Sequence, residues 1–357
     1  MSQTSQLMDP GRVRVRRRRV ALVLLLVVAV AAVASWAAIV VLQRFTGGAA
    51  DYPGPGTGQV VIEIVAGDTS SDIAQTLVAE DVVASPQAFV SAALNDDRAL
   101  GIQPGFYELR RQMSGEQALE LLLDPASRVE TSVTVPEGLR LGQTVDELVG
   151  QTDIPRSDFE SILADPRVLR LPLYAEGSAE GFLFPATYTF DPGASAKDML
   201  KAMVDRYHLA ESDLNLRQRS AQEGLTPREA LTVASLVQAE VAERDFGKAA
   251  RVVFNRLAAG MPMQFDSTVN YALGSDDLTL DNDQLGVDSP YNTYVNAGLP
   301  PGPINSPGEA AIEAALDPPA GDWLYFVAVA PDSDATRFTA DYDEFLQLKD
   351  EFYAQVP

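Results

Sequence analysis

Apolar residues recur at helical spacing along residues 227–240, and a carboxylate then continues the same face. The inward stripe holds Ala230, Val233, Leu236 and Val237. Glu240 follows Leu236 by four residues and Val237 by three. A buried carboxylate without partners stays protonated with a raised pKa, which is what a general acid requires. The alternative is an ion pair of Glu240 with Arg244 or Arg251, and periodicity alone favours it.

The helix that carries Glu240 has clear sequence signals at its start. Residues 226–229 supply an N-cap threonine, a proline at the first helical position and a glutamate that completes a capping box. A second helix is predicted over residues 245–259, with Asp245 as its cap, and Gly260 ends it. The two helices are expected to form a hairpin with Glu240 close to the bend.

A small α+β module is predicted for residues 59–127. Its order is strand (59–65), helix, helix, strand (105–109) and helix, with Ser85 and Ser114 as caps of the last two helices. The opening strand, turn and helix resemble a LysM-like module. Glycan binding and a spacer role are both open for it.

Residues 128–357 are predicted to form a larger mixed α+β domain, so the fold class is α+β. A strand and a helix follow one another in residues 132–148, and an aromatic-rich loop feeds a short strand in residues 181–190. Those aromatic rings either form the base of a sugar-binding site or belong to the hydrophobic core, and composition favours the core. The apolar run at 322–330 predicts a central buried strand.

A membrane anchor is predicted ahead of these modules. Basic residues at 12–19 precede 23 uncharged, largely apolar residues at 20–42, long enough to cross a bilayer as a helix. The positive flank predicts a cytoplasmic tail (1–19) and an extracytoplasmic body, tethered to the cell membrane through a Gly- and Pro-rich linker (43–58). A cleaved signal peptide is the alternative, and the length of the run favours the anchor.

Composition narrows the chemistry that is available to the body. The formal net charge is −23, which argues against binding of a nucleic-acid backbone. Cysteine is absent and His208 is the single histidine, so thiolate nucleophiles are excluded, and histidine triads and multi-histidine metal sites nearly so. Carboxylates, hydroxyls, amides and arginines are left. Two segments, 260–274 and 289–310, mix hydroxyls and amides with tyrosine, which suits sugar recognition.

Six sequence blocks, in this order, resemble the MltG (YceG-like) family of endolytic murein transglycosylases over about residues 59–350. They read VPEGLRL, EGFLFPATY, LTVASLVQAE, VVFNRLAAGMPMQFDSTVNYALG, SPYNTYVNAGLPPGPINSPGEAAIEAAL and WLYFVA. The catalytic glutamate of the family corresponds to Glu240. This correspondence reverses the preference for an ion pair at that residue.

The resemblance implies a lyase that cleaves the bond between N-acetylmuramic acid and N-acetylglucosamine within peptidoglycan strands. The product would carry a 1,6-anhydro end, Glu240 would act as general acid and then base, and no metal or organic cofactor would be needed. Termination of nascent strands beside peptidoglycan synthases is the expected role. A non-catalytic wall-binding scaffold is the main alternative, and a lyase that uses pyridoxal phosphate is poorly supported by an external body with four lysines.

The chain departs from the family pattern at three places, and the resemblance also suggests substrate contacts. Gln238 stands where an acidic residue is common, Ala239 replaces a basic one, and Thr336 and Arg337 stand where a histidine is expected. The first two are expected to change the environment that sets the pKa of Glu240. Gln264, in GMPMQ, is similar to the Gly-Leu-Met-Gln element of other lytic transglycosylases, which makes it a candidate substrate contact. The further candidates are Asp266, Thr268, Tyr271, Tyr291, Asn292 and Tyr294.

Overall fold

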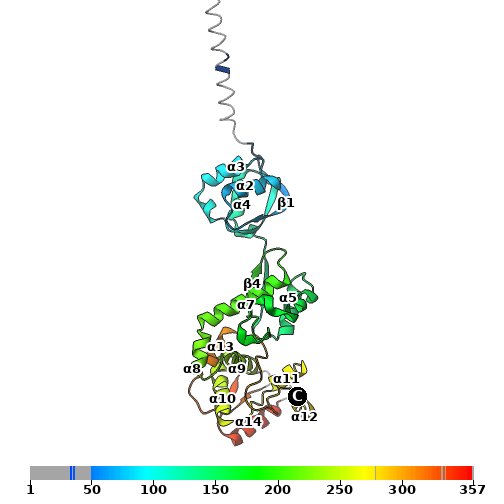
Figure 1. Cartoon of the computed structure of the whole chain (residues 1–357), viewed down its shortest axis with the longest axis vertical. Coiled ribbons are helices and arrows are strands. Elements are labelled where there is room, and N and C mark those ends of the chain that lie inside the picture. Colours follow the sequence, from blue (N-terminus) through cyan, green and yellow to red (C-terminus); the bar gives the residue numbers. More distant parts are fainter. Residues whose placement is uncertain are drawn as a thin grey trace, which may run out of the picture. The chain divides into compact units, whose positions relative to one another are not determined.

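The computed structural model describes residues 33, 35, 36, 50–277, 279–330, 333 and 335–355. It divides into two compact units, Met1–Val129 and Glu130–Pro357, which are described separately (Figure 1). The sequence predicted a module boundary two residues earlier, after residue 127. Most of the predicted anchor at 20–42 lies outside the described residues, as do the tail and residues 43–49 of the linker. Among the residues that are described, none forms a helix long and apolar enough to span a membrane.

The first unit packs helices on one antiparallel pair of strands (Figure 1). Strand β1 (Pro55–Ile64) pairs with β2 (Gly105–Met113), and the helices are α2 (Ser70–Ala79), α3 (Pro86–Leu94) and α4 (Gly115–Leu123). One buried cluster joins all five elements through side chains such as Ile62, Leu77, Phe89, Leu109 and Leu119. The predicted order of elements is the observed one. The likeness to a LysM-like module stays a prediction.

Local polar contacts fix the ends of helices in this unit. Ser85 Oγ accepts from Ala88 N at 3.3 Å, and Ser114 Oγ accepts from Gln117 N at 3.3 Å, so both predicted caps are confirmed. These bonds satisfy amide groups that a helix leaves free at its N-terminus.

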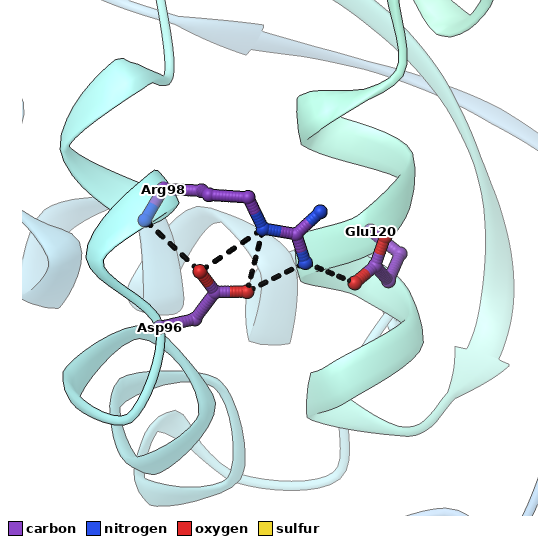
Figure 2. Close-up of polar contacts among 3 residues, drawn as sticks. All are labelled: Asp96, Arg98 and Glu120. Atoms are coloured by element: carbon purple, nitrogen blue, oxygen red, sulfur yellow. Dashed lines mark hydrogen bonds and ion pairs between the residues drawn. The ribbon is translucent and has the colours of Figure 1, made fainter.

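An arginine links the turn after α3 to helix α4 (Figure 2). Arg98 lies in a 3₁₀ turn (Asp97–Gly101), and its Nη2 is 2.7 Å from Asp96 Oδ2 and 2.5 Å from Glu120 Oε1. Because Arg98 and Glu120 are largely exposed, water screens these pairs and their contribution to stability is small.

The second unit begins with a two-stranded sheet and three helices. Strand β3 (Thr131–Val135) pairs with β4 (Ala186–Phe190), and α5 (Leu141–Gln151), α6 (Arg156–Ala164) and α7 (Ala196–Asp213) pack around them. The aromatic rings of the 181–190 segment are buried, namely those of Phe182, Phe184, Tyr188 and Phe190. They belong to the core, as composition indicated.

Helix α9 (Pro227–Glu240) is the centre of the second unit, and it packs against α10 (Phe246–Ala259) and α13 (Glu309–Leu316) (Figure 1). All eight residues from Ala230 to Val237 are buried. The predicted capping box is present, and Gly260 ends α10 with a φ of 65°. Asp245 stands at the start of α10 but makes no side-chain capping bond, and a 3₁₀ turn (Glu243–Asp245) precedes it. The remaining helices of this region are α8 (Leu216–Gln222), α11 (Asp266–Leu273) and α12 (Asn282–Leu285).

The prediction of a central buried strand at 322–330 is wrong. The segment forms only β5 (Tyr325–Ala328), which pairs with β6 (Thr336–Thr339) in a two-stranded sheet and is partly exposed. Its apolar side chains pack on other aromatic rings instead of inside a larger sheet. The ring of Phe326 lies 5.7 Å from that of Phe265, and the ring of Tyr325 lies 4.9 Å from that of Phe345 in α14 (Tyr342–Tyr353).

Candidate active site

Glu240 is the last residue of α9, and its carboxyl meets the first turn of α11. Ser267 Oγ donates a hydrogen bond to Glu240 Oε1 at 2.5 Å. The apolar residues of α9 hold the helix in the core, while the position of Glu240 at the helix end leaves it partly exposed. The sequence therefore predicted the place of Glu240 on the helix correctly, and the structure adds its partner.

The surroundings of Glu240 tune its proton affinity. Although the residue as a whole is partly exposed, burial of its carboxyl raises the pKa of Glu240 to about 7, and the negative charge of Asp266 raises the pKa too. The hydroxyl and backbone N–H of Ser267 and the positive charge of Arg256 act in the opposite direction. Near neutral pH the carboxyl is therefore divided between its protonated and ionised forms. A group in this state can give up a proton and take one back.

The two arginines that the sequence offered as ion-pair partners of Glu240 contact other groups. Arg251 donates to the backbone carbonyls of Pro318 and Pro319, at 2.6 Å each. Arg244 Nε lies 3.7 Å from Asp245 Oδ2. The raised pKa of Glu240 agrees with these contacts, because a close ion pair would lower it.

A third arginine, Arg256 on α10, organises the backbone near Glu240. It is buried, and its guanidinium donates to the carbonyls of Leu324 (2.7 Å), Pro262 (3.4 Å) and Met263. These bonds join the segment that leads into α11 to the residue before β5. Sequence reasoning missed Arg256, since nothing in the local pattern separates it from a surface arginine.

Two of the predicted substrate contacts, Gln264 and Asp266, are exposed, and the charge of Asp266 acts on Glu240. Asp266 precedes Ser267 and accepts a hydrogen bond from Tyr294 Oη at 2.5 Å. Gln264 has an exposed side chain and a left-handed backbone with a φ of 54°, held by a bond from its N–H to Thr293 O at 3.1 Å. Both side chains are accessible to a ligand.

Thr268 and Asn292 are fully buried and hold loops. Thr268 Oγ1 donates to Phe265 O at 2.6 Å and lies 2.9 Å from Thr293 Oγ1. Asn292 Nδ2 donates to the carbonyls of Leu285 and Val287, at 2.9 Å each. The structure thus places these two candidates in the support of the surrounding segments, where their polar groups already have protein partners.

Tyr271 and Tyr291 come together as a ring pair, although 20 residues separate them. Their ring centroids are 4.7 Å apart with the planes tilted by 49°. Both residues are partly exposed. Tyr271 Oη also donates to Glu180 Oε2 at 3.3 Å.

Glu180 is a second buried carboxyl that sequence reasoning missed. It is 7% exposed, and burial raises its pKa to about 7. Leu141 N, the first amide of α5, donates to its two oxygens at 3.0 and 3.2 Å. A signal was present in the sequence, because Glu180 opens the EGFLFPATY block. In the structure, the next residue, Gly181, has a φ of 85°, a conformation that favours glycine.

The departures at 238 and 239 lie away from the groups that set the pKa of Glu240. Gln238 Oε1 accepts from Gly308 N at 2.9 Å, and its side chain also hydrogen-bonds to Glu137, whose pKa is raised by burial. Ala239 is exposed. Arg337, in the third departure, lies on β6 and pairs with Glu351 at 3.4 Å. The expected effect of these two departures on Glu240 is therefore not seen, because burial and the charge of Asp266 raise its pKa without an acidic residue at 238.

Known proteins share this sequence and fold. The model of the YceG-like family matches residues 62–351. A protein of Bacillus subtilis (strain 168) named endolytic murein transglycosylase is 33% identical over 309 residues, which cover 82% of this chain and 84% of the relative. One of the same name from Streptococcus pneumoniae serotype 2 is 34% identical over 268 residues, which cover 64% of this chain and 46% of the relative.

A solved structure agrees with these relatives. A YceG-like protein of Listeria monocytogenes superposes with a TM-score of 0.56 and 29% sequence identity, covering 82% of this chain and all of that one. The family model spans far more than half of the chain, as the six sequence blocks predicted. This chain therefore belongs to the YceG-like family.

Proposed function

We propose that this chain cleaves peptidoglycan glycan strands internally as a lytic transglycosylase, with Glu240 as the group that moves the proton. The relatives named endolytic murein transglycosylase confirm the predicted class, a lyase that acts on peptidoglycan. The observation that supports the assignment to Glu240 is its carboxyl, which is held by Ser267 and has a pKa of about 7. The sequence resemblance assigns the catalytic role to this same position.

The proposed reaction needs one carboxyl in two states. Protonated Glu240 gives its proton to the glycosidic oxygen as the bond from C1 of N-acetylmuramic acid to that oxygen breaks. The C6 hydroxyl of the same sugar then attacks C1 and passes its proton to the Glu240 carboxylate. The ring closes as a 1,6-anhydro sugar, no water is consumed, and Glu240 is protonated again. A second carboxylate, usual in glycoside hydrolysis, is not required.

The geometry at Glu240 suits this sequence of proton transfers. Ser267 donates to Oε1, so Oε1 serves as an acceptor and the exchangeable proton belongs on Oε2. A pKa of about 7 keeps both the acid and the base accessible at neutral pH. The intramolecular C6 hydroxyl gains effective concentration over water.

The proposal includes a location outside the cytoplasm. The 23-residue run at 20–42 behind the basic residues 12–19 supports a single-pass anchor with a cytoplasmic N-terminus. The second unit, which contains Glu240, would then meet glycan strands where peptidoglycan synthases release them, at the extracytoplasmic face of the cell membrane. Anchored in this way, the enzyme would terminate strand growth.

Mass spectrometry of digests of defined, uncrosslinked glycan strands tests the reaction type. The purified full chain is expected to release fragments with 1,6-anhydro ends, each lighter by one water than the matching hydrolysis product. Fragments with reducing ends would show a hydrolase. Binding of strands without any cleavage would favour a wall-binding scaffold and contradict the proposal.

A further inference from the structure

Glu180 is held more firmly than a helix cap requires. Its carboxyl accepts from Leu141 N at 3.0 and 3.2 Å and from Tyr271 Oη at 3.3 Å. The next residue, Gly181, packs so closely on Pro303 that a side chain would collide with its ring. A serine or asparagine caps a helix without the cost of burying an ionisable group. The burial of Glu180 therefore indicates a role in addition to capping the N-terminus of α5.

Helix α11 links Glu180 to Glu240. Ser267, the partner of Glu240, and Tyr271, the partner of Glu180, are four residues apart on this helix. Residues at this spacing lie on one face, with Cβ atoms roughly 5–6 Å apart. The two carboxyls thus contact hydroxyls on successive turns of the same helix face.

Several contacts fix the ring of Tyr271. Tyr291 lies against it at 4.7 Å between ring centroids, and the Arg140 guanidinium lies 5.9 Å from its centre. Arg140 is itself held by Asn270 O at 3.2 Å and by Asp276 Oδ1 at 2.9 Å. Since Glu180 binds the hydroxyl, both the rotation of the ring and the position of its tip are determined.

We propose that Glu180 is a positioning residue that holds the Tyr271–Tyr291 ring pair as a wall for an N-acetyl amino sugar of the glycan strand, one helical turn from the partner of Glu240. The apolar C–H face of a sugar packs on aromatic rings, and both tyrosines are partly exposed residues. This inference rests on the proposed function, because the strand is the ligand.

Steady-state cleavage of uncrosslinked strands by the full chain tests the inference. Tyr271→Phe removes only the hydroxyl that Glu180 holds, and Glu180→Ala removes the holder. Each is expected to raise KM about fivefold and to change kcat by less than about twofold, and the double variant is expected to match the larger single effect. Glu180→Gln, which retains polar contacts to both neighbours, is expected to keep KM near that of the wild type.

Controls separate positioning from folding. Glu160→Gln changes an exposed glutamate of α6 and is expected to leave KM unchanged. Thermal midpoints identify any variant that does not fold, and Tyr271→Phe, in which the cap of α5 is intact, then carries the test. An unchanged KM for Tyr271→Phe, or effects of Glu180→Ala and Tyr271→Phe that multiply, would overturn the positioning role. Wild-type chain that released no anhydro ends would instead overturn the proposed function.

Discussion

Ser267 donates a hydrogen bond to the carboxyl of Glu240 across 2.5 Å and so ties the end of α9 to the first turn of α11. The serine binds one carboxyl oxygen and lowers the pKa of Glu240, which burial holds at about 7. Asp266, the preceding residue, has the opposite effect on this pKa through its negative charge. Two neighbours thus adjust the proton affinity of one group in opposite directions.

Replacing Ser267 with alanine should move the pH dependence of cleavage upward. Loss of the hydroxyl removes an influence that lowers the pKa of Glu240, so the acid form persists to higher pH. The fall of kcat/KM with rising pH is expected to shift to higher pH, and the maximal rate to drop roughly three- to tenfold because Oε1 is no longer held. Ser157→Ala, on the surface of α6, is the control. If the fall of kcat/KM with rising pH stayed at the wild-type pH, the role of Ser267 would be contradicted.

Replacing Asp266 with asparagine should shift the fall of kcat/KM with rising pH in the opposite direction, to lower pH. The charge of Asp266 raises the pKa of Glu240, and its removal therefore lets Glu240 ionise at lower pH. The amide oxygen of asparagine can still accept from Tyr294 Oη, so the local contact is retained. The pH–rate profiles of Asp266→Asn and of Asp158→Asn, a surface control, would be compared. An upward shift in Asp266→Asn would be inconsistent with this electrostatic effect.

Gln238→Glu should destabilise the second unit in a pH-dependent way. The new carboxylate would lie beside Glu137, whose pKa is already raised by burial. The substitution would also remove the hydrogen bond from the Gln238 amide that lowers the pKa of Glu137. Carboxyl groups with raised pKa values in the folded state stabilise it at low pH, and this contribution is lost as the pH rises through those values. Because Glu137 is exposed and solvent screens the two charges, the free energy of unfolding is expected to fall by only about 0.5 kcal/mol at pH 8, and by less at pH 4.

Denaturant unfolding measures this difference, with Gln218→Glu on an exposed surface as the matched control. A loss of stability that is equal at both pH values would point to packing and not to charge. The contact of Gln238 with Gly308 N is expected to survive, because glutamate retains the acceptor oxygen.

Arg256→Ala should lower stability far more than the loss of a surface arginine. The guanidinium is buried and donates to three backbone carbonyls, which would be left without it. The expected loss is about 3 kcal/mol, measured from the midpoint and slope of denaturant unfolding. Arg167→Ala removes a side chain that is 87% exposed and should change stability by less than about 0.5 kcal/mol. Equal losses in the two variants would show that the carbonyl contacts contribute little.

Local sequence signals predicted the helices well. The capping box at Thr226 and the cap at Ser85 are formed by residues a few positions apart, so the sequence contains the whole interaction. The place of Glu240 on α9 follows from the same periodicity. The strand at 322–330 was mispredicted because an apolar run does not reveal whether its neighbours are strands or aromatic rings.

Contacts between distant segments could not be predicted. Ser267 is 27 residues from Glu240, and Glu180 is 91 residues from Tyr271. No periodicity relates such pairs, since their proximity depends on how α9, α11 and the loop before β4 pack. Asn292 shows the reverse case, because a polar residue typical of sugar sites is here fully buried and holds a loop.

The role of Glu240 can be measured with Glu240→Gln, which keeps the size and an acceptor for Ser267 but cannot give and recover a proton at neutral pH. Mass spectrometry would follow the 1,6-anhydro ends that the wild-type and variant full chains release from uncrosslinked glycan strands, with thermal unfolding as the check on folding. We expect anhydro ends from the wild type and none from the folded variant, a loss of at least about a hundredfold. Anhydro ends released by Glu240→Gln at a rate near that of the wild type would contradict the assignment of Glu240 as general acid and base.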